Sequence, residues 1–467
     1  MKNMIKIVSL LTILFFTGCA LGPDFEEPVV ESPDKYRLEE AKADSLTNLE
    51  WWQLFSDPVL DTLVQAALTE NKDLRIAASR IEEARANLGF TKADIYPRLD
   101  IQAGASRGNF TGGFKLPDET NNFSIAAPLT WEIDFWGKFR RSNEAAKAEF
   151  LSSQYSLRTV QISLISEVVG TYFLLLDFEQ RLEVSKHTLE SRKRSLDIIQ
   201  MRYNEGIIPE IDVNQAQIQL EIAVAAIPIY KRQVAKTENA LSILLGRLPD
   251  SIQKGKDLNS QTIPPKIPSG IPAQILERRP DIQDAKYRVQ AQNARIGVAE
   301  AMRFPSISLT GIFGAASDDL STILDGGPAW SITGSLFGPL FNFNKNTLRV
   351  EIEEERTKQA MLRYELVVLN AFREVEDALV EVKTFNNQLA SLERRYKAAS
   401  NAAKLSKIRY DKGVTSYLEV LDTERTLFNA ELELSEVRQN YLSAYIKVYK
   451  SLGGGWISRK EKEDSEQ

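Results

Sequence analysis

The sequence predicts a mainly α-helical fold with a transmembrane β part, built as a duplicated unit. Three observations predict it. Apolar residues recur every seven positions over long stretches, Arg-Tyr-x-x-Gly turns interrupt this period at Gly206 and Gly413, and short segments alternate apolar and polar residues. A sustained seven-residue period indicates helices that supercoil around each other, whereas alternation indicates strands with two unlike faces. Each copy is therefore expected to hold two strands and a long coiled-coil hairpin.

The first residues have the pattern of an export signal. Lys2 and Lys6 precede an apolar stretch that ends at Phe16, and small residues lead to Cys19, the single cysteine of 467 residues. Such a segment is typical of a secretory signal and is too short to span a membrane as a helix. Leu-Phe-Phe-Thr-Gly-Cys also resembles a bacterial lipoprotein box, which implies a signal peptide over residues 1–18 and a covalent lipid, such as palmitate, on Cys19. A plain signal peptide with an incidental cysteine is the alternative.

Composition narrows the function class. The chain is 43% hydrophobic and 26% charged with a formal net charge of −6, which becomes −8 when the signal peptide takes Lys2 and Lys6 with it. A protein this acidic, without a basic cluster, is a poor partner for nucleic acid. No uninterrupted run of 18 apolar residues follows Cys19, so any membrane crossing is expected to use strands.

Catalytic and metal-binding patterns are missing from the sequence. His187 is the only histidine, lies in a polar helical stretch, and is expected to be a surface residue. One histidine and one cysteine cannot build a His/Cys metal site or a Cys-His catalytic pair, and no phosphate-binding glycine loop is present. We expect no enzyme activity, no metal and no cofactor apart from the lipid on Cys19.

The first repeat is expected over residues 51–246, after an extended, lipid-anchored lead over residues 19–50. Asp57-Pro58 supplies a helix N-cap and a first-turn proline. After Pro97 the period changes to two, which predicts a β-hairpin over about 97–136 with a loop rich in Gly, Asn and Thr. A coiled-coil hairpin with its tip at Gly206 completes the copy.

The second repeat, residues 281–455, matches the first position by position. Gly89 and Pro97 align with Gly297 and Pro305, and similar matches extend through both copies, which indicates a duplicated structural unit. A β-hairpin is expected over about 305–343 and a tip at Gly413. Residues 247–280 are rich in proline and predict a crossover linker, and residues 456–467 predict a disordered charged tail.

The number of strands per chain limits how many chains could form a closed barrel. Two hairpins give four strands, and four strands cannot close into a barrel around a lumen. Two chains would give a filled barrel of eight strands, and three would give twelve strands and an open pore. A half-buried sheet of a soluble protein explains the alternation equally well, so this alternative stays open at this point.

Several motifs together resemble the outer-membrane efflux duct family, in its lipoprotein branch that serves resistance-nodulation-division (RND) pumps. They are Cys19 to Phe25, the Trp-Trp-Gln-Leu-Phe-Ser-Asp-Pro run that ends at Pro58, the Trp-Glu-Ile-Asp-Phe-Trp-Gly-Lys run that starts at Trp131, and Leu-Glu-Arg-Arg-Pro-Asp-Ile around Pro280. The resemblance implies a homotrimer that forms an α/β tunnel with a shared 12-stranded outer-membrane barrel. It also implies an outer-membrane location, outer-membrane lipid around the barrel, and a periplasmic adaptor and an inner-membrane RND pump as partners.

The same resemblance implies roles for residues at the two tips. Glu419 and Asp422 lie about one turn apart and would form acidic rings that narrow a periplasmic gate, with Asp212 at the corresponding place in copy one. An alternative for Glu419 is a capping box with Ser416. Tyr203 and Tyr410 are candidates for latch residues or simply the last apolar positions of their heptads. Gly206 and Gly413 are expected to stop the helices in the left-handed conformation and to contact the adaptor.

Passive export of small molecules from the periplasm and pump to the exterior is therefore the leading functional interpretation, in which energy comes from the pump. Two alternatives remain. One is an exit duct for a type I polypeptide secretion system, whose members usually lack the lipid anchor. The other is a periplasmic coiled-coil lipoprotein without a transport role, which leaves the alternating strands unexplained. The sequence does not single out a substrate among drugs, dyes, metal ions and bile salts.

Overall fold

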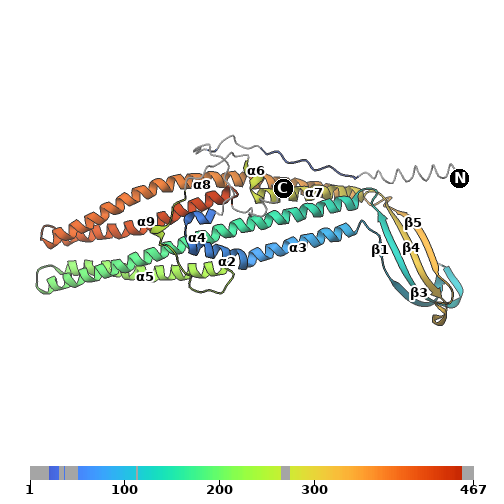
Figure 1. Cartoon of the computed structure of the whole chain (residues 1–467), viewed down its shortest axis with the longest axis horizontal. Helices are drawn as coiled ribbons and strands as arrows, with labels where there is room; N and C mark the ends of the chain where they lie inside the picture. Colours follow the sequence, from blue (N-terminus) through green and yellow to red (C-terminus); the bar gives the residue numbers. More distant parts are fainter. Residues whose placement is uncertain (1–19, 31–35, 37–50, 112–113, 265–273, 455–467) are drawn as a thin grey trace. The chain divides into compact units, whose positions relative to one another are not determined.

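The computed structural model describes residues 20–30, 36, 51–111, 114–264 and 274–454. It divides into two compact units. One combines residues 1–29, 80–154 and 284–365 and carries the strands, and the other combines residues 30–79, 155–283 and 366–467. Four of the helices contribute residues to both units. Figure 1 labels the helices and strands along the chain.

The helices repeat in order and in length. Copy one has the 3₁₀ turn η1 (Trp51–Phe55), α2 (Pro58–Glu70), α3 (Lys72–Ala93), α4 (Lys138–Asn204) and α5 (Glu210–Leu244). After the short turns η2 (Leu258–Ser260) and α6 (Gln274–Arg278), copy two has α7 (Pro280–Ala301), α8 (Lys345–Asp411) and α9 (Tyr417–Ser451). Both α4 and α8 have 67 residues, and both α5 and α9 have 35, so the duplication extends to element length.

The strands of both copies form one antiparallel sheet. Its members are β1 (Arg98–Leu99), β2 (Gln102–Thr111), β3 (Phe114–Ile133), β4 (Ser306–Ser317) and β5 (Ala329–Phe337), with the 3₁₀ turn η3 (Leu320–Thr322) between the last two. β1 and β2 pair in one continuous register with the same edge of β3, so the sheet has four strand positions, in the order β1/β2-β3-β4-β5. The two hairpins are joined by β3 and β4, from Phe123 opposite Ser317 to Ile133 opposite Ile307. Among the described strands, β2 and β5 are each left with one unpaired edge.

The two faces of the sheet differ in polarity. On one face, aligned neighbours are apolar: Trp131 lies opposite Leu309, and Phe313 lies opposite Trp330. On the other face, Thr130, Thr310 and Thr333 align across three strands, and the hydroxyl groups of Ser308 and Ser335 are 2.6 Å apart. Trp330 is 71% exposed and Phe313 is 62% exposed, so the described chain leaves the apolar face uncovered. Large uncovered apolar surface is typical of contact with lipid or another protein.

The transition from sheet to helix is fixed by the Trp131–Lys138 motif. The Asp134 carboxylate caps α4, because it accepts hydrogen bonds from the backbone N–H groups of Phe139 and Arg140 at 3.0 and 2.9 Å. The Trp136 ring stacks on Phe304 at 4.6 Å, and its indole N–H donates to the Pro305 carbonyl at 2.8 Å. These contacts tie the end of β3 to the start of β4, so copy one leaves the sheet beside the point where copy two enters it.

The main hydrophobic core lies in the unit without strands. Most of its members come from η1, α2, α4, α5, α8 and α9. They include Phe55, Leu60, Val168, Tyr172, Phe173, Leu175, Leu241 and Leu442, all at most 1% exposed. One stretch of 18 residues in α4 is apolar enough in composition to cross a membrane, but 56% of it is buried within the protein, as expected for a core helix. The heptad positions of α4 that the sequence marks as apolar therefore serve packing.

Two buried polar groups hold segments against this core. Asp57 is fully buried, and its carboxylate accepts hydrogen bonds from the Tyr172 hydroxyl, the Gln261 amide and the Lys256 backbone N–H at 2.8, 2.8 and 3.2 Å. It thereby attaches the crossover linker to the start of α2 and the middle of α4. Burial alone would raise the pKa of Asp57, but these hydrogen bonds lower it.

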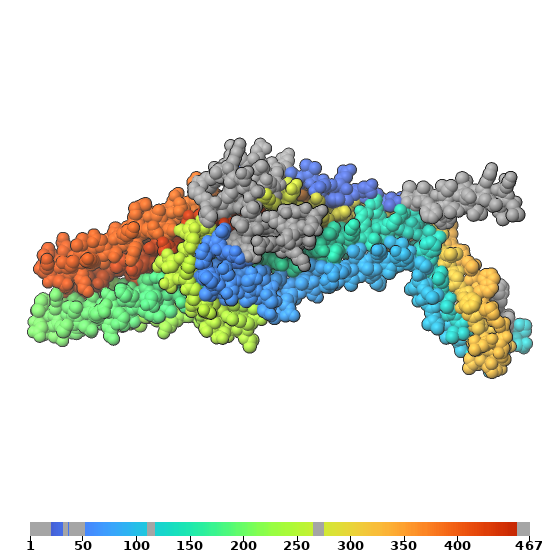
Figure 2. Space-filling view, viewed as in Figure 1, coloured from blue at the N-terminus to red at the C-terminus, as the bar shows by residue number. Residues whose placement is uncertain are grey.

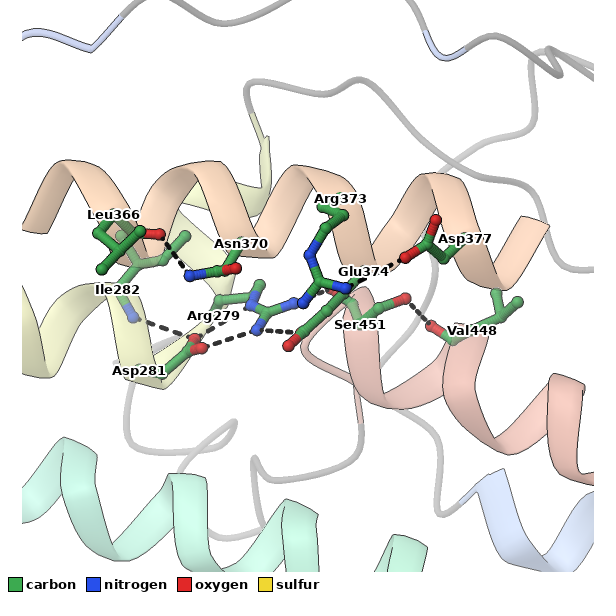
Figure 3. Close-up of polar contacts among 10 residues, drawn as sticks. All are labelled: Arg279, Asp281, Ile282, Leu366, Asn370, Arg373, Glu374, Asp377, Val448 and Ser451. Atoms are coloured by element: carbon green, nitrogen blue, oxygen red, sulfur yellow. Dashed lines mark hydrogen bonds and ion pairs between the residues drawn. The ribbon is translucent and has the colours of Figure 1, made fainter. Parts of the chain in front are cut away.

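Arg279 plays the corresponding part in copy two (Figure 3). Its buried guanidinium donates to both carboxylate oxygens of Asp281, to Glu374 of α8 at 2.8 Å, and to the Ser451 carbonyl at the end of α9 at 3.0 Å. Three helices therefore meet at one cation. This explains why the Arg-Arg-Pro-Asp sequence stands at the start of the second repeat.

Candidate functional site

The candidate site is the tip region. It consists of the α4/α5 turn around Gly206, the α8/α9 turn around Gly413 and the adjacent helical turns of these four helices. Both turns lie at the same end of their unit (Figure 1). The surfaces of the two hairpins meet in the space-filling view, with α8 and α9 in orange and red beside α4 and α5 in green (Figure 2). The tip region therefore contains side chains of both copies.

The two turns have the same backbone geometry. Gly206 and Gly413 have φ of 70° and 72°, which is the left-handed region that glycine adopts without strain. In each turn the glycine N–H donates to a tyrosine carbonyl, Tyr203 or Tyr410, and the next residue donates five positions back, at 2.8 to 2.9 Å. This pair of bonds is the Schellman motif that ends helices. The Arg-Tyr-x-x-Gly sequence thus acts as a sharp stop for α4 and for α8.

Glu419 does not form the capping box that the sequence allows. The Ser416 side chain makes no capping hydrogen bond at the start of α9, and the Glu419 carboxylate instead lies 3.2 Å from the Arg409 guanidinium and also accepts a hydrogen bond from the Thr415 hydroxyl. Arg409 comes from across the turn, whereas Thr415 directly precedes the N-cap of α9. A guanidinium attracts a carboxylate more strongly than a neutral backbone N–H does. Glu419 therefore bridges the end of α8 and the start of α9.

Asp422 and Asp212 are placed differently. Asp422 is exposed and pairs with Arg425 one turn further along α9 at 2.6 Å. Asp212 is half-buried in the first turn of α5, and its charge acts on Tyr417 of α9. Glu419 and Asp422 thus share a helix but point to separate cations, and the three acids do not meet in one chain.

Tyr410 contacts the other hairpin, whereas Tyr203 does not enter this contact. The Tyr410 ring lies 5.3 Å from the Tyr417 ring, and the Arg202 guanidinium of α4 lies over it at 4.7 Å. The Tyr410 hydroxyl is buried without a partner among the described residues, whereas Tyr203 is 38% exposed. Arg202 also approaches Asp411 at 4.0 Å. Of the two candidate latch tyrosines, only Tyr410 lies where two hairpins meet.

A small apolar cluster lies next to these contacts. Ile199 of α4, Ala216 of α5 and Tyr417, Val420 and Leu421 of α9 are buried together. Burial raises the pKa of the Tyr417 hydroxyl, and the charges of Glu424, Tyr410 and Asp212 raise it further. The Tyr417 hydroxyl therefore stays protonated at physiological pH. Arg202 and Tyr417 were not predicted from the sequence, because their role depends on contacts between the two copies.

A second candidate site is the strap that follows the lipid-anchor position. Cys19 itself lies outside the described residues, and Ala20 is the first residue after it. The Leu21 N–H donates to the Trp136 carbonyl at 3.2 Å, and the buried Arg141 guanidinium donates to the carbonyls of Leu21 and Gly22 at 3.0 Å. The strap is therefore attached where β3 passes into α4.

Charge and close packing hold this strap in place. Arg141 is also 2.9 Å from Asp24 and from Glu144, and its side chain is 7% exposed. Gly22 packs so closely on Gly297 of α7 that a Cβ on Gly22 would lie 2.4 Å from the Gly297 Cα. Arg141 was not predicted from the sequence. Its only signal was the Arg140-Arg141 pair after the helix start, in a region of ordinary charge density.

Together, an antiparallel sheet with an apolar face and unpaired edges, two long helical hairpins and two tips at one end define a class of protein, the outer-membrane channels with a helical tunnel. The family model for "Outer membrane efflux protein" matches residues 63–247 and 271–454. This chain belongs to that family, and the fold class that the sequence predicts is confirmed.

Known relatives match along nearly the whole chain. "Cation efflux system protein CusC" of Escherichia coli O6:H1 is 33% identical over 97% of this chain and 99% of its own length. "Toluene efflux pump outer membrane protein TtgI" of Pseudomonas putida is 34% identical, with 97% and 98% covered. "Probable outer membrane lipoprotein SilC" of Salmonella typhimurium is 31% identical, with 97% and 99% covered.

Solved structures share the fold. The crystal structure of CusC matches with a TM-score of 0.83 at 32% identity and covers 94% of this chain and all of that one. The outer-membrane channel OprN matches with a TM-score of 0.87 at 30% identity, with the same coverage. The chain is therefore an outer-membrane efflux protein, as the sequence motifs predict.

Proposed function

We propose that this protein is the outer-membrane channel of a tripartite efflux system, through which small molecules pass passively from an inner-membrane RND pump and the periplasm to the exterior. The observation that carries the proposal is the sheet. It has an apolar face, a hydroxyl-rich face and unpaired edges at β2 and β5. Edges of this kind require further strands, and four strands per chain cannot enclose a lumen.

Three copies of the chain meet both requirements. In a homotrimer, β5 of each subunit would pair with β2 of the next and give a barrel of twelve strands. The apolar face with Trp131, Phe313 and Trp330 would meet outer-membrane lipid, and the face with Thr130, Thr310 and Thr333 would line the lumen. Members of the efflux family form trimers, which supports this number.

The lipid anchor is the second part of the proposal. Cys19 would carry a covalent lipid after removal of residues 1–18. The strap of Leu21 to Asp24 on Arg141 would then hold the lipid near the end of β3, where the barrel meets the inner leaflet. SilC, a relative along nearly the full chain, is described as a probable outer membrane lipoprotein, which supports this part.

At the tips, the periplasmic adaptor would dock around Gly206 and Gly413, and the acids would form the gate. Rings of Glu419 and Asp422, with Asp212 from the first hairpin, would concentrate negative charge at the entrance and favour cations. Tyr410, held between Arg202 and Tyr417, would act as the latch between hairpins. The second hairpin carries both Glu419 and Asp422, so we expect it to move on opening.

The names of the relatives favour efflux over polypeptide secretion or a purely structural role. CusC is a cation efflux protein and TtgI a toluene efflux pump protein, so the names point to more than one substrate class. A gene deletion, complemented with the wild-type chain, should be profiled against copper and silver salts, organic solvents, bile salts and antibiotics. Increased sensitivity that the wild-type chain reverses would identify the substrate class.

Two measurements on the purified protein test the channel itself. Light scattering of the detergent-solubilised protein should give the mass of three chains, and planar bilayers should show discrete ion conductance. A monomer without β-structure in its circular dichroism spectrum would contradict the barrel. Globomycin, which blocks lipoprotein signal cleavage, should cause the precursor to accumulate if Cys19 is lipidated, and a Cys19→Ser variant should carry no lipid.

A further inference from the structure

The two hairpins meet at several helix pairs, and one seam between them is formed by the facing side chains of α4 and α9. Along α9, these side chains repeat every seven residues in two interleaved rows: Tyr417, Glu424 and Glu431, and Leu421, Phe428 and Ser435. Contacts with α4 show that these α9 side chains face that helix. Ile199 packs among Tyr417 and Leu421, the Arg192 guanidinium lies 5.0 Å from the Phe428 ring centroid, and Asp177 bonds to Ser435. Polar residues at such inward positions reduce coiled-coil stability.

Far from the tip, the seam is fully paired. The buried Asp177 carboxylate accepts hydrogen bonds from Ser435 at 2.6 Å and from Arg181 at 2.9 Å. Arg181 also lies 3.3 Å from Glu436 of α9. Burial raises the pKa of Asp177, opposed by its bonds to Arg181 and Ser435, and these partners hold the two helices in one register. This end of the seam is therefore fixed.

Nearer the tip, Arg192 lacks such partners. Its side chain is 3% exposed, and only one of its nitrogens, Nη1, donates to a protein acceptor, the Gln219 carbonyl of α5 at 2.5 Å. Nε and Nη2 have no hydrogen-bond acceptor in the part of the chain that the structure describes. Burial lowers the pKa of Arg192, against the opposing charges of Glu424 and Tyr417. A buried cation with two unpaired donors destabilises its surroundings.

Two carboxyl groups flank Arg192 along the same seam. Glu424 and Glu431, one heptad apart on α9, are partly buried, and neither forms a hydrogen bond or an ion pair with any described residue. Burial raises the pKa of Glu424, opposed by Lys407 of α8 and Arg192 of α4. Burial also raises the pKa of Glu431, opposed by His187 of α4. Compared with a solvent-exposed glutamate, each group is therefore shifted towards its protonated form in the closed seam.

We propose that Arg192 is a positioning residue for opening of the channel, and that the tip half of the seam separates when Glu424 and Glu431 are ionised and closes when they are protonated. The inference deepens the proposed channel function and rests on it. The paired Asp177 end serves as the fixed pivot. Ionised carboxylates and the two free Arg192 donors gain water when the helices part, which favours the separated form.

The sign of the pH effect follows from the same contacts. Because the closed seam binds more protons than the separated one, a fall in pH closes it and a rise opens it. The Arg192 charge stabilises ionised Glu424 within the closed seam, and Lys407 does the same, whereas Tyr417 adds no charge while it stays protonated. His187 of α4 is the basic group that faces Glu431. Glu424 is therefore the main control, and Arg192 sets the pH at which it acts.

Distances between spin labels on the two hairpins test this proposal without any transport assay. The full chain in detergent, with labelled cysteines at the exposed positions Arg194 of α4 and Asn429 of α9, would be measured by pulsed electron paramagnetic resonance from pH 5 to 8. We expect the longer distances to gain population as pH rises. A label pair at Lys397 and Asn429, within the second hairpin, should show no change.

Variants then separate the electrostatic role from a structural one. The Glu424→Gln/Glu431→Gln double variant should keep the short distance at every pH. Arg192→Leu should move the midpoint to higher pH, because Glu424 loses a stabilising charge, while Arg192→Lys and the surface control Lys193→Leu should keep the wild-type midpoint. If Arg192→Leu does not fold, the double variant and Arg192→Lys decide the matter.

Three outcomes would overturn the inference: distances that do not change with pH in the wild type, a wild-type profile in the double variant, or an unmoved midpoint in folded Arg192→Leu. Failure of the proposed channel function would give a different combination of results. A chain that shows the expected distance profile but no conductance in planar bilayers contradicts the channel alone, and a conducting chain with fixed distances contradicts the seam alone.

Discussion

The Asp177 carboxylate of α4 accepts a 2.6 Å hydrogen bond from the Ser435 hydroxyl of α9, and this buried contact joins the first helical hairpin to the second. The residue of copy one that corresponds to Ser435 is Pro228, inside α5, which has neither a hydroxyl nor a backbone N–H. The contact can therefore form in only one of the two equivalent places. The duplicated hairpins have become different, and α9 is the helix that is tied to α4.

Replacement of Asp177 should weaken the whole helical unit. In Asp177→Ala, Arg181 keeps a largely buried guanidinium, with only its 3.3 Å contact to Glu436 left as an ion pair. Loss of one partner of a buried pair costs about 3 kcal/mol. Thermal unfolding followed by helical circular dichroism should show a clearly lowered Tm. Ser435→Ala removes one hydrogen bond, worth about 1 kcal/mol, and should lower Tm less. An equal or larger loss in Ser435→Ala would contradict this ranking.

Replacement of Asp57 should release the crossover linker. Asp57→Ala removes the acceptor of the Tyr172 hydroxyl and of the Lys256 N–H, and one of the two acceptors of the Gln261 amide, at a cost of at least about 2 kcal/mol. Trypsin should then cut after Lys254 or Lys256 faster than in the wild type. Asp257→Ala serves as the control, because the Asp257 side chain makes no capping bond to the same linker. Equal cleavage rates in both variants would show that Asp57 does not hold the linker.

The same residue predicts a pH dependence. Because hydrogen bonds lower the pKa of Asp57 in the folded chain below its ordinary value of 3.8, its ionised form stabilises the fold above that value. This contribution is lost as pH falls through the lower, folded pKa. The difference in Tm between wild type and Asp57→Ala should therefore be constant near neutral pH and shrink below about pH 4. A difference that grows on acidification would contradict the sign.

Local sequence patterns predicted the helices and strands of the fold better than the contacts between them. The heptad positions Val168 and Leu175 are fully buried, and the glycines at 206 and 413 end their helices in the left-handed conformation. Such features depend on neighbours within a few residues. The alternation after Pro97 likewise predicted a two-faced sheet, because side-chain direction in a strand depends only on position.

Contacts between distant segments could not be read from those patterns. The β3–β4 pairing joins residues 174 to 194 positions apart along the chain, and Arg141 reaches the strap 117 to 120 residues away. The Ser416–Glu419 capping box was a local prediction and is wrong, because Arg409 returns across the turn and offers a full charge. Arg192 carries no sequence signal at all, since its burial depends on three helices.

Replacement of Arg141 should free the strap after Cys19. The guanidinium holds two strap carbonyls and the Asp24 carboxylate, and hydrogen bonds from a charged donor contribute roughly 1.5 to 3 kcal/mol each. In Arg141→Ala, amide hydrogens of a peptide that covers residues 20–29 should exchange roughly tenfold faster or more by mass spectrometry. Lys147→Ala, an exposed change on the same helix, should leave the exchange rate unchanged. Unchanged protection in Arg141→Ala would mean that the Gly22–Gly297 contact alone holds the strap.

Neutralising the acids of the second tip should widen and neutralise the proposed entrance. In the Glu419→Gln/Asp422→Asn variant, Arg409 and Arg425 lose their carboxylate partners, so the α8/α9 turn is held less tightly and the local negative field is removed. Single-channel recordings in planar bilayers should show larger conductance and weaker cation preference, both most evident at low salt, where charges are least screened.

Glu205→Gln is the matched control, because Glu205 is an exposed acid at the first tip. Wild-type conductance and selectivity in the double variant would rule out Glu419 and Asp422 as the gate. The paired geometry of Glu419 with Arg409 and Thr415 would then serve only to shape the turn.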